Sequence, residues 1–271
     1  MHFYGLFGES LSHSLSPQLH QLIYQKLGIE AAYKPFAFEP KLMAQAIAGV
    51  RALSIDGVNV TIPYKETVIP YLDEMDILAN QLNAVNTIEH KDQKLIGHNT
   101  DYAGFGLIFD RRNWKIEGKR AVLLGTGGAA KTVEAYLIDH GIAHLTIVSR
   151  SPERFENTEK ISYTNYESLS HLTGDYLINS TPVGMYPNSD DTPVDDVVIE
   201  NFDTLIDLIY NPKVTRFLEI GHTLAKQTAN GLDMLIGQGV RAVEIWENCV
   251  IEDTIIEELI EHFQKEIGEQ T

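Results

Sequence analysis

A glycine-rich turn between an apolar run and a helix-like segment constrains the fold of this chain more than any other feature. The apolar run Val122–Leu124 leads into Gly125-Thr126-Gly127-Gly128-Ala129-Ala130. A second apolar run, Leu145–Val148, follows within about 30 residues, which is the span of a βαβ unit. This order predicts two parallel strands joined by a helix, and hence a doubly wound parallel sheet in this part of the chain.

The small residues of this turn have the spacing of a dinucleotide-binding turn. Gly125, Gly127 and Ala130 occupy the three small positions of G-x-G-x-x-G/A. The first permits the tight turn, the second lets a pyrophosphate approach the backbone, and the third lets helix and strand pack closely. The helix expected over 128–139 then points its free N–H groups at the phosphates. A glycine turn can be only a turn, but the complete unit favours dinucleotide binding.

The end of the second strand indicates which dinucleotide is bound. NAD enzymes usually place an acidic residue about 20 residues past the turn, where it holds the ribose 2′-hydroxyl. This chain has Ser149-Arg150-Ser151 there, with Arg154 shortly after. A guanidinium can bind a 2′-phosphate bidentately, whereas a carboxylate would repel it. We therefore expect NADP; the alternative is that both arginines are solvated charges at the start of a helix.

Length and charge narrow the class of protein. At 271 residues the chain suggests about two domains, and its net charge of −17 argues against nucleic acid or an anionic membrane as a partner. Cys249 is the only cysteine, which excludes an intrachain disulfide and a cysteine-rich zinc site. The histidines, His13, His20 and His98 among them, show no ligand spacing, so no metal is expected. No secretory signal or membrane span is recognised, and we expect a cytoplasmic protein.

The first hundred residues alternate short strands with helices. Strands are expected over 3–7, 32–38 and 57–61, and helices over 16–27, 40–50 and 63–71. A hairpin of 84–89 with 94–98 would make this sheet mixed. The parallel sheet of the second half continues at 176–179 and 205–210. The expected fold class is α/β with two domains: a mixed-sheet domain over 1–101 and a Rossmann-type NADP domain over 102–237, with helices in the last 30 or so residues.

Four polar clusters fall at strand ends or turns, where side chains can face a site: 12–17, 59–65, 83–87 and 99–101. Ser14 and Ser16 can hold a small carboxylate, although Ser16 can also be a simple helix N-cap before Pro17. Lys65 falls in the first turn of an expected helix, where a cation is electrostatically unfavourable. A residue that breaks such a local rule can have a functional role. The alternative is that Lys65 is an ordinary solvated lysine on the surface. The asparagines of clusters 83–87 and 99–101, together with Asp101, supply amide and carboxylate groups that can form hydrogen bonds with several hydroxyls of a ligand.

Taken together, these clusters resemble the shikimate dehydrogenase family. The matching motifs are Ser12-His13-Ser14-Leu15-Ser16-Pro17, Asn59-Val60-Thr61 through Lys65, Ala84-Val85-Asn86-Thr87, Asn99-Thr100-Asp101, the glycine turn, Asn179-Ser180-Thr181-Pro182-Val183-Gly184-Met185, and Gly231-Leu232-Asp233-Met234 through Gln238. They occur in order over most of the chain. Each is modest alone, but the series is specific. The resemblance implies reversible, NADPH-dependent reduction of 3-dehydroshikimate to shikimate in chorismate and aromatic amino-acid biosynthesis.

The resemblance also implies roles for individual residues. Lys65 and Asp101 would form the proton-transfer pair, which suits hydride addition to a ketone because the oxygen then needs a proton donor. The substrate-binding residues would be Ser14 and Ser16 at the carboxylate with Tyr210 assisting, and Thr61, Asn86, Asp101 and Gln238 at the ring hydroxyls. The cofactor-binding residues would be Gly125, Thr126, Gly127, Gly128, Ala129, Ser149, Arg150, Arg154, Leu208, Gly231 and Met234. The resemblance further implies that 1–101 is the substrate-binding and catalytic domain, completed by helices in 238–271, and that 102–237 is the NADP-binding domain. It leaves open a monomer or a homodimer.

Several positions depart from the family pattern. Ser149 replaces the asparagine usual before the arginine, Thr126 replaces an alanine, and Tyr102 stands where glycine is usual. These departures remove no proposed catalytic group, so the properties that they put in question are affinity and substrate range. Three other functions stay open: a quinate/shikimate dehydrogenase with relaxed substrate or NAD use, a non-catalytic sensor of a related metabolite, and an NADP reductase acting on an unrelated small acid.

Overall fold

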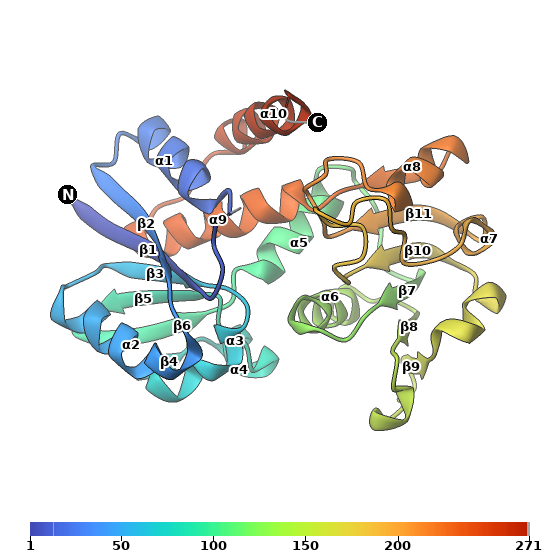
Figure 1. The fold of residues 1–271 in the computed structure, drawn as a ribbon, viewed down its shortest axis with the longest axis horizontal. Helices are drawn as coiled ribbons and strands as arrows, with labels where there is room; N and C mark the ends of the chain where they lie inside the picture. The colour runs from blue at the N-terminus through green and yellow to red at the C-terminus, as the bar shows by residue number, and fades with distance from the viewer. Residues whose placement is uncertain (13, 270–271) are drawn as a thin grey trace. The chain divides into compact units, whose positions relative to one another are not determined.

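Each half of the chain builds its own six-stranded sheet (Figure 1). The computed structural model describes residues 1–12 and 14–269. It divides into two units, Met1–Gly104 with Leu235–Leu259, and Phe105–Met234 with Ile260–Thr271. The predicted boundaries at 101/102 and 237/238 lie close to two of these divisions, whereas the end of the C-terminal helix falls in the second unit. The assignment of substrate and cofactor domains to these units stays a prediction.

The sheet of the first unit is mixed, as predicted. Its strand order is β2-β1-β3-β5-β6-β4, and β5 runs antiparallel to both β3 and β6 while the other pairs are parallel. The strands are β1 (His2–Gly8), β2 (Ala31–Ala37), β3 (Gly57–Val60), β4 (Glu74–Met75), β5 (Thr87–Lys91) and β6 (Lys94–His98). The helices are α1 (Ser16–Leu27), α2 (Met43–Ala52), α3 (Tyr64–Thr67), α4 (Ile77–Leu82) and the start of α5 (Asp101–Asp110), with short 3₁₀ turns η1 (Pro40–Leu42) and η2 (Ile69–Tyr71).

Two apolar layers hold this sheet. On one side, Met43, Ile47 and Val50 of α2 and Tyr64 of α3 form one buried cluster with Val58 of β3. On the other side lie α1 and α9 (Leu232–Glu247), as Figure 1 shows. Trp246 of α9 stacks on Tyr4 with ring centroids 4.5 Å apart, and its indole nitrogen donates to the Ile88 carbonyl at 3.0 Å. The C-terminal part of α9 is therefore built into the first unit.

The sheet of the second unit is wholly parallel, in the order β12-β11-β10-β7-β8-β9. Its strands are β7 (Arg120–Leu124), β8 (His144–Val148), β9 (Ile161–Thr164), β10 (Gly174–Asn179), β11 (Phe202–Asp207) and β12 (Gln227–Ala229). Its helical segments are α6 (Gly128–Asp139), η3 (Pro152–Arg154), η4 (Tyr166–His171), α7 (Asp196–Ile199) and α8 (Arg216–Thr223), and α10 (Asp253–Glu269) closes the described chain. The predicted α/β class, with one mixed and one doubly wound parallel sheet, is confirmed.

Three local expectations differ from the structure. The N-cap of α1 is Leu15, so Ser16 is the first helical residue, because the Ser14 hydroxyl already accepts a hydrogen bond from the Ser16 amide at 3.3 Å. The helix expected over 63–71 is only the single turn α3 followed by η2, since Pro70 cannot supply a helical N–H. The helix-dipole argument for Lys65 is therefore wrong, because in a four-residue helix the first turn is also the last.

Candidate functional site

Strand pairing in the first unit brings three distant segments together. Thr87, at the start of β5, pairs with Asn59 of β3 and with His98 of β6. Because β5 is antiparallel to both neighbours, the carboxyl ends of β3 and β6 lie at the same edge of the sheet, beside the residues that enter β5. The turn that carries Lys65 follows β3, and Asp101 follows β6. The register of β5 therefore determines which polar side chains meet.

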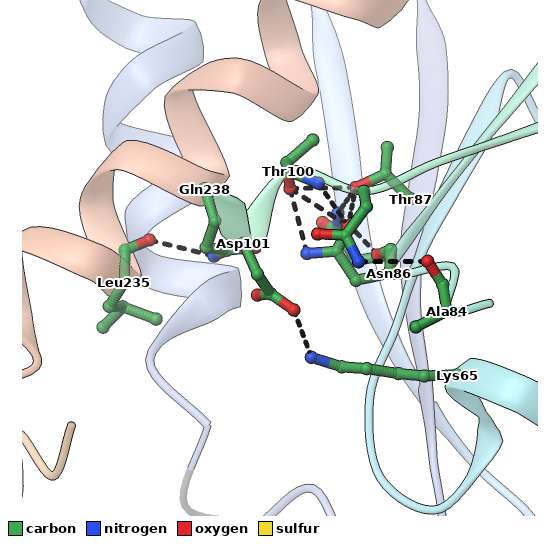
Figure 2. Close-up of polar contacts among 10 residues, drawn as sticks. Lys65, Ala84, Asn86, Thr87, Thr100, Asp101, Leu235 and Gln238 are labelled. Carbon is green, nitrogen blue, oxygen red and sulfur yellow. Dashed lines mark hydrogen bonds and ion pairs between the residues drawn. The ribbon is translucent and has the colours of Figure 1, made fainter. Parts of the chain in front are cut away.

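The ammonium of Lys65 lies against the carboxylate of Asp101 (Figure 2). Lys65 Nζ is 2.5 Å from Asp101 Oδ2, which is a charge-assisted hydrogen bond. The side chains are 20% and 11% exposed, so both are largely buried but still open to a ligand. Asp101 is the first residue of α5, where the positive end of the helix dipole favours a carboxylate. This arrangement can hold a proton next to a reacting oxygen.

A buried amide lies next to this pair. Asn86 immediately precedes β5, and its Oδ1 accepts from the Thr100 backbone N–H at 2.7 Å. Asn86 Nδ2 donates to Thr100 Oγ1 at 3.0 Å, and Thr87 Oγ1 donates to Asn86 Oδ1 at 3.2 Å. Figure 2 shows these bonds gathered around the residue just before Asp101. Asn86 is thus rigidly held by its neighbours.

The other predicted substrate residues of the first unit occupy its helix and strand ends. Ser14 is half-buried, and Ser16 is buried and hydrogen-bonded to the Tyr33 hydroxyl. Thr61 is half-buried directly after β3, where its backbone N–H donates to the Phe7 carbonyl at 2.9 Å. Gln238 lies on α9 and donates from Nε2 to the Leu235 carbonyl at 2.9 Å. His13 lies outside the described residues.

The glycine turn of the second unit opens onto a cavity of about 640 Å³. Gly125 has φ of +101°, a backbone conformation that other residues rarely adopt, so the tight turn requires glycine there. The predicted residues that line the cavity are Gly125, Thr126, Gly127, Ser149, Arg150 and Arg154. Gly128 and Ala129 are the first two residues of α6, which begins at this turn. The structure therefore brings the predicted turn and the predicted cations to one cavity.

The charge at this cavity fits an anion. Arg150 and Arg154 are exposed and line the cavity. The first turn of α6 contains no acidic residue, so its free N–H groups face no competing carboxylate on their own helix. Ser149 is buried, and its hydroxyl accepts from the Ser151 N–H at 3.1 Å, which shapes the loop that carries Arg150. A phosphate-bearing ligand is the group that such donors and cations suit.

Comparison with known proteins gives the family. Residues 6–88 match the model of the shikimate dehydrogenase substrate binding domain. The shikimate dehydrogenase (NADP(+)) of Clostridium beijerinckii is 47% identical over 268 residues, which cover 98% of this chain and 99% of that protein. The chain belongs to the shikimate dehydrogenase family.

Solved structures of the family have the same fold over nearly the whole chain. Shikimate dehydrogenase 1 from Peptoclostridium difficile is 44% identical, with a TM-score of 0.93 and coverage of 98% of this chain and 99% of that chain. The shikimate 5-dehydrogenase from Listeria monocytogenes, solved in complex with shikimate and NAD, is 30% identical, with a TM-score of 0.85 and 96% of each chain covered. The arrangement of two sheets is thus the family fold.

The remaining predicted residues belong to the second unit. Leu208, Tyr210, Gly231 and Met234 are absent from the described lining of the 640 Å³ cavity. Gly231 lies so close to Leu208 that an added Cβ would be 2.0 Å from the Leu208 carbonyl oxygen, and its N–H donates to the Ile209 carbonyl at 3.0 Å. Tyr210 is half-buried, and burial raises the pKa of its hydroxyl. Met234 is buried at the start of α9.

Part of the cavity wall was not among the predicted cofactor residues. The wall also contains Val148, Ser151, Phe155, Tyr166, Ser180, Thr181, Pro182, Val183 and Pro193. The segment 180–183 follows β10, and the carboxyl ends of parallel strands lie at one edge of a sheet. The strand pattern could therefore have predicted that this segment lies at the cavity. Phe155 and Tyr166 gave no such signal. Phe155 lies in the β8–β9 connection, directly after the 3₁₀ turn η3, and Tyr166 begins η4 after β9. The expected sheet does not predict the path of either segment.

A buried carboxylate supports two loops of the second unit. Asp207, at the end of β11, accepts from Thr215 Oγ1 at 2.6 Å, from Asn179 Nδ2 at 3.0 Å and from the Ile209 N–H at 3.1 Å. Burial raises the pKa of Asp207 to about 6, although these three donors oppose the rise. Asn179 in turn accepts from the Thr181 N–H at 3.0 Å. Asp207 therefore links the 180–183 segment of the cavity wall to the loop after β11.

Two classes of feature are absent from the described residues. Residues 1–12 and 14–269 contain no group of three or more His, Cys, Asp or Glu side chains that could hold a metal ion. Within the same residues, no helix is both long and apolar enough to cross a membrane.

Proposed function

We propose that this chain is an NADP-dependent shikimate dehydrogenase, which reversibly reduces 3-dehydroshikimate to shikimate in aromatic amino-acid biosynthesis. The observation that carries the proposal is the pair of Lys65 Nζ and Asp101 Oδ2, 2.5 Å apart, in a member of this family. The proposal agrees with the name of the Clostridium beijerinckii relative, shikimate dehydrogenase (NADP(+)), which specifies both an activity and a cofactor.

The pair supplies the proton chemistry of a carbonyl reduction. A bound nicotinamide supplies the hydride. As negative charge builds on the carbonyl oxygen, the Lys65 ammonium stabilises it and donates a proton to it. In the reverse direction the pair takes the hydroxyl proton of the substrate. The Asp101 carboxylate orients the Lys65 side chain and favours its charged form.

The substrate carboxylate and hydroxyls match the polar groups of the first unit. Ser14 and Ser16, at the N-terminal end of α1, bind the carboxylate, and Tyr210 assists. Thr61, Asn86, Asp101 and Gln238 bind the ring hydroxyls. Their support is chemical: each is a hydrogen-bonding side chain that is neither fully solvated nor hidden in the apolar layers. The structure of the Listeria monocytogenes relative contains shikimate, which agrees with a substrate of this class.

The 640 Å³ cavity is the proposed cofactor site. The turn 125–129 and the first N–H groups of α6 bind the pyrophosphate, and Arg150 and Arg154 bind the 2′-phosphate of the adenosine ribose. Ser149 lies at the same wall, and Leu208, Gly231 and Met234 complete the nicotinamide side. No acidic residue takes the place of Arg150, which favours NADP over NAD.

One absorbance assay tests the activity, cofactor and substrate together. The purified protein is mixed with shikimate or quinate and with NADP⁺ or NAD⁺, and the absorbance of the reduced nicotinamide is followed. Rapid reduction with shikimate and NADP⁺ alone is expected. Comparable rates with quinate or NAD⁺ would instead assign a quinate/shikimate dehydrogenase, an alternative that the NAD in the Listeria monocytogenes structure favours. No turnover with any pair would contradict the proposal.

We also propose that the enzyme acts in the cytoplasm and is a monomer or a homodimer. The single cysteine and the net charge of −17 support a reducing, aqueous compartment. Cell fractionation tests the compartment, and light scattering on the purified protein tests the oligomeric state.

A further inference from the structure

The two amide side chains beside the Lys65–Asp101 pair have orientations that main-chain groups determine. A backbone N–H can only donate and a backbone carbonyl can only accept. The atom of Asn86 that lies 2.7 Å from the Thr100 N–H must therefore be its oxygen, Oδ1. The atom of Asn59 that lies 3.4 Å from the Asn86 carbonyl oxygen must in the same way be its nitrogen, Nδ2. Neither amide can flip without placing like groups together.

From these two points the direction of the bonds that lead to Thr87 follows. Because Asn59 turns Nδ2 toward β5, its Oδ1 faces Tyr33 and accepts from that hydroxyl at 2.7 Å. Asn59 Nδ2 also donates to Thr87 Oγ1 at 3.0 Å, which leaves the Thr87 hydrogen to donate to Asn86 Oδ1 or to Thr100 Oγ1, each 3.2 Å away. The hydrogen bonds thus run from Tyr33 through Asn59 and Thr87 to Asn86, either directly or by way of the Thr100 hydroxyl, which lies 3.2 Å from Asn86 Oδ1. Figure 2 shows the end of this chain, at Thr87, Asn86 and Thr100.

Asn86 Oδ1 has no capacity left for a ligand. It faces the Thr100 N–H and the hydroxyls of Thr87 and Thr100, at 2.7, 3.2 and 3.2 Å. Asn86 Nδ2 carries two hydrogens, and the bond to Thr100 Oγ1 at 3.0 Å uses one of them. Among the described residues the second hydrogen has no bonded acceptor. Thr87 and Thr100 are fully buried, so solvent does not reorganise this network easily.

We propose that Asn86 meets the substrate only as a hydrogen-bond donor, and that Asn59 and Thr87 are positioning residues that fix this polarity. The inference rests on the proposed function, which places Asn86 at the ring hydroxyls. A hydroxyl that accepts from Asn86 keeps its own hydrogen for an acceptor, and the Asp101 carboxylate is an acceptor in the same part of the site. In this arrangement the Asn86 amide donates to the substrate hydroxyls and the Asp101 carboxylate accepts from them.

The change Asn86→Asp tests the polarity directly, because it keeps the shape and replaces the donor by an acceptor. Binding of shikimate is measured by titration calorimetry, which does not depend on turnover. We expect affinity to fall at least about tenfold, the effect of losing a hydrogen bond whose partner stays unpaired. Unchanged or tighter binding would overturn the proposal, since it would mean that Asn86 accepts from the substrate.

Two variants of Thr87 test the positioning role and stand in if Asn86→Asp does not fold. Thr87→Val removes the hydroxyl and keeps the shape, whereas Thr87→Ser keeps the hydroxyl. We expect Thr87→Val to raise the KM for shikimate about three- to tenfold with kcat and the KM for NADP⁺ unchanged, and Thr87→Ser to restore the KM. If the KM for shikimate is the same in both variants and the wild type, the positioning role is wrong. It is also wrong if Thr87→Val raises the KM for NADP⁺ as much as the KM for shikimate.

The wild-type controls separate this inference from the proposed function. A wild type that oxidises shikimate while Asn86→Asp binds as tightly supports the function and contradicts the polarity. A wild type that binds shikimate without turnover contradicts the function, and the calorimetric comparison still decides the polarity. A wild type that neither binds nor oxidises shikimate contradicts both.

Discussion

At the scale of single residues, Arg150 and Asp207 differ in exposure and in partners. Arg150 is exposed and lines the cavity, where we propose that it binds the cofactor. Asp207 is fully buried with three internal donors, which indicates a supporting role. A substitution at each should therefore affect a different measurement: cofactor affinity for Arg150, and stability for Asp207.

The change Arg150→Ala should weaken NADP⁺ far more than NAD⁺. A guanidinium bonded to a phosphate contributes about 1.5–3 kcal/mol, so the Kd for NADP⁺ should rise about 10- to 100-fold. Binding of both cofactors is measured by fluorescence titration. Arg216→Ala is the control, because Arg216 is an arginine of the same unit that is paired with Glu219 at 2.6 Å and lies outside the cavity. An equal loss for both cofactors would show that Arg150 does not bind the 2′-phosphate.

The raised pKa of Asp207 predicts a pH dependence of stability. Its pKa is about 6 in the folded protein against an ordinary 3.8, so the folded state binds the proton more tightly than the unfolded state. The stability that this proton contributes is fully present below about pH 4 and is lost as the pH rises through 6. The total change is at most about 3 kcal/mol, at 1.36 kcal/mol per pH unit.

Denaturant unfolding of the wild type and of Asp207→Asn from pH 4 to pH 7 measures this effect. The stability of the wild type relative to Asp207→Asn should fall across this range. Asp203→Asn is the control, because it removes an exposed carboxylate from the same strand. A constant difference for Asp207→Asn would show that Asp207 does not titrate in this range.

At the scale of elements, the pattern of residues predicted the regular segments and failed where one residue changes the backbone. The helix over 128–139 has the predicted bounds, because the glycine turn defines its start. The helix over 63–71 was wrong because Pro70 interrupts it. The connection from β8 to β9 holds only a 3₁₀ turn where sequence reasoning allowed a helix start at Arg150. Short apolar and polar spacing cannot distinguish such a turn from a helix.

Two glycines predict opposite effects of the same substitution. Gly231→Ala would place Cβ 2.0 Å from the Leu208 carbonyl oxygen, so the backbone must move, at a cost of about 1–3 kcal/mol. Gly49→Ala lies in α2 with no atom within 4 Å of the new Cβ, so it should stabilise the protein by about 0.5–1 kcal/mol. Chemical denaturation of both variants checks the pair. Similar stability changes in both would contradict the close approach at Gly231.

At the scale of the whole molecule, two sheets of different kinds carry two sets of functional groups. The residues of both sets were predictable by type, since polar clusters at strand ends and a glycine turn are visible in the sequence. Their distances were not. Lys65 and Asp101 are 36 positions apart and meet only because Thr87 pairs with both Asn59 and His98. The alternation within each strand limits its register by fixing which face is buried, but it does not identify which distant strand becomes its neighbour.

The most direct measurement compares the wild type with Lys65→Ala in the oxidation of shikimate by NADP⁺, with NADP⁺ affinity measured separately. We expect kcat to fall by about 10²- to 10⁴-fold, as for loss of a general acid–base group, while the Kd for NADP⁺ stays unchanged. Lys26→Ala is the control, because Lys26 forms an ion pair with Glu258 away from Asp101 and should keep the wild-type kcat. A Lys65→Ala enzyme with wild-type kcat would contradict the role of the Lys65–Asp101 pair.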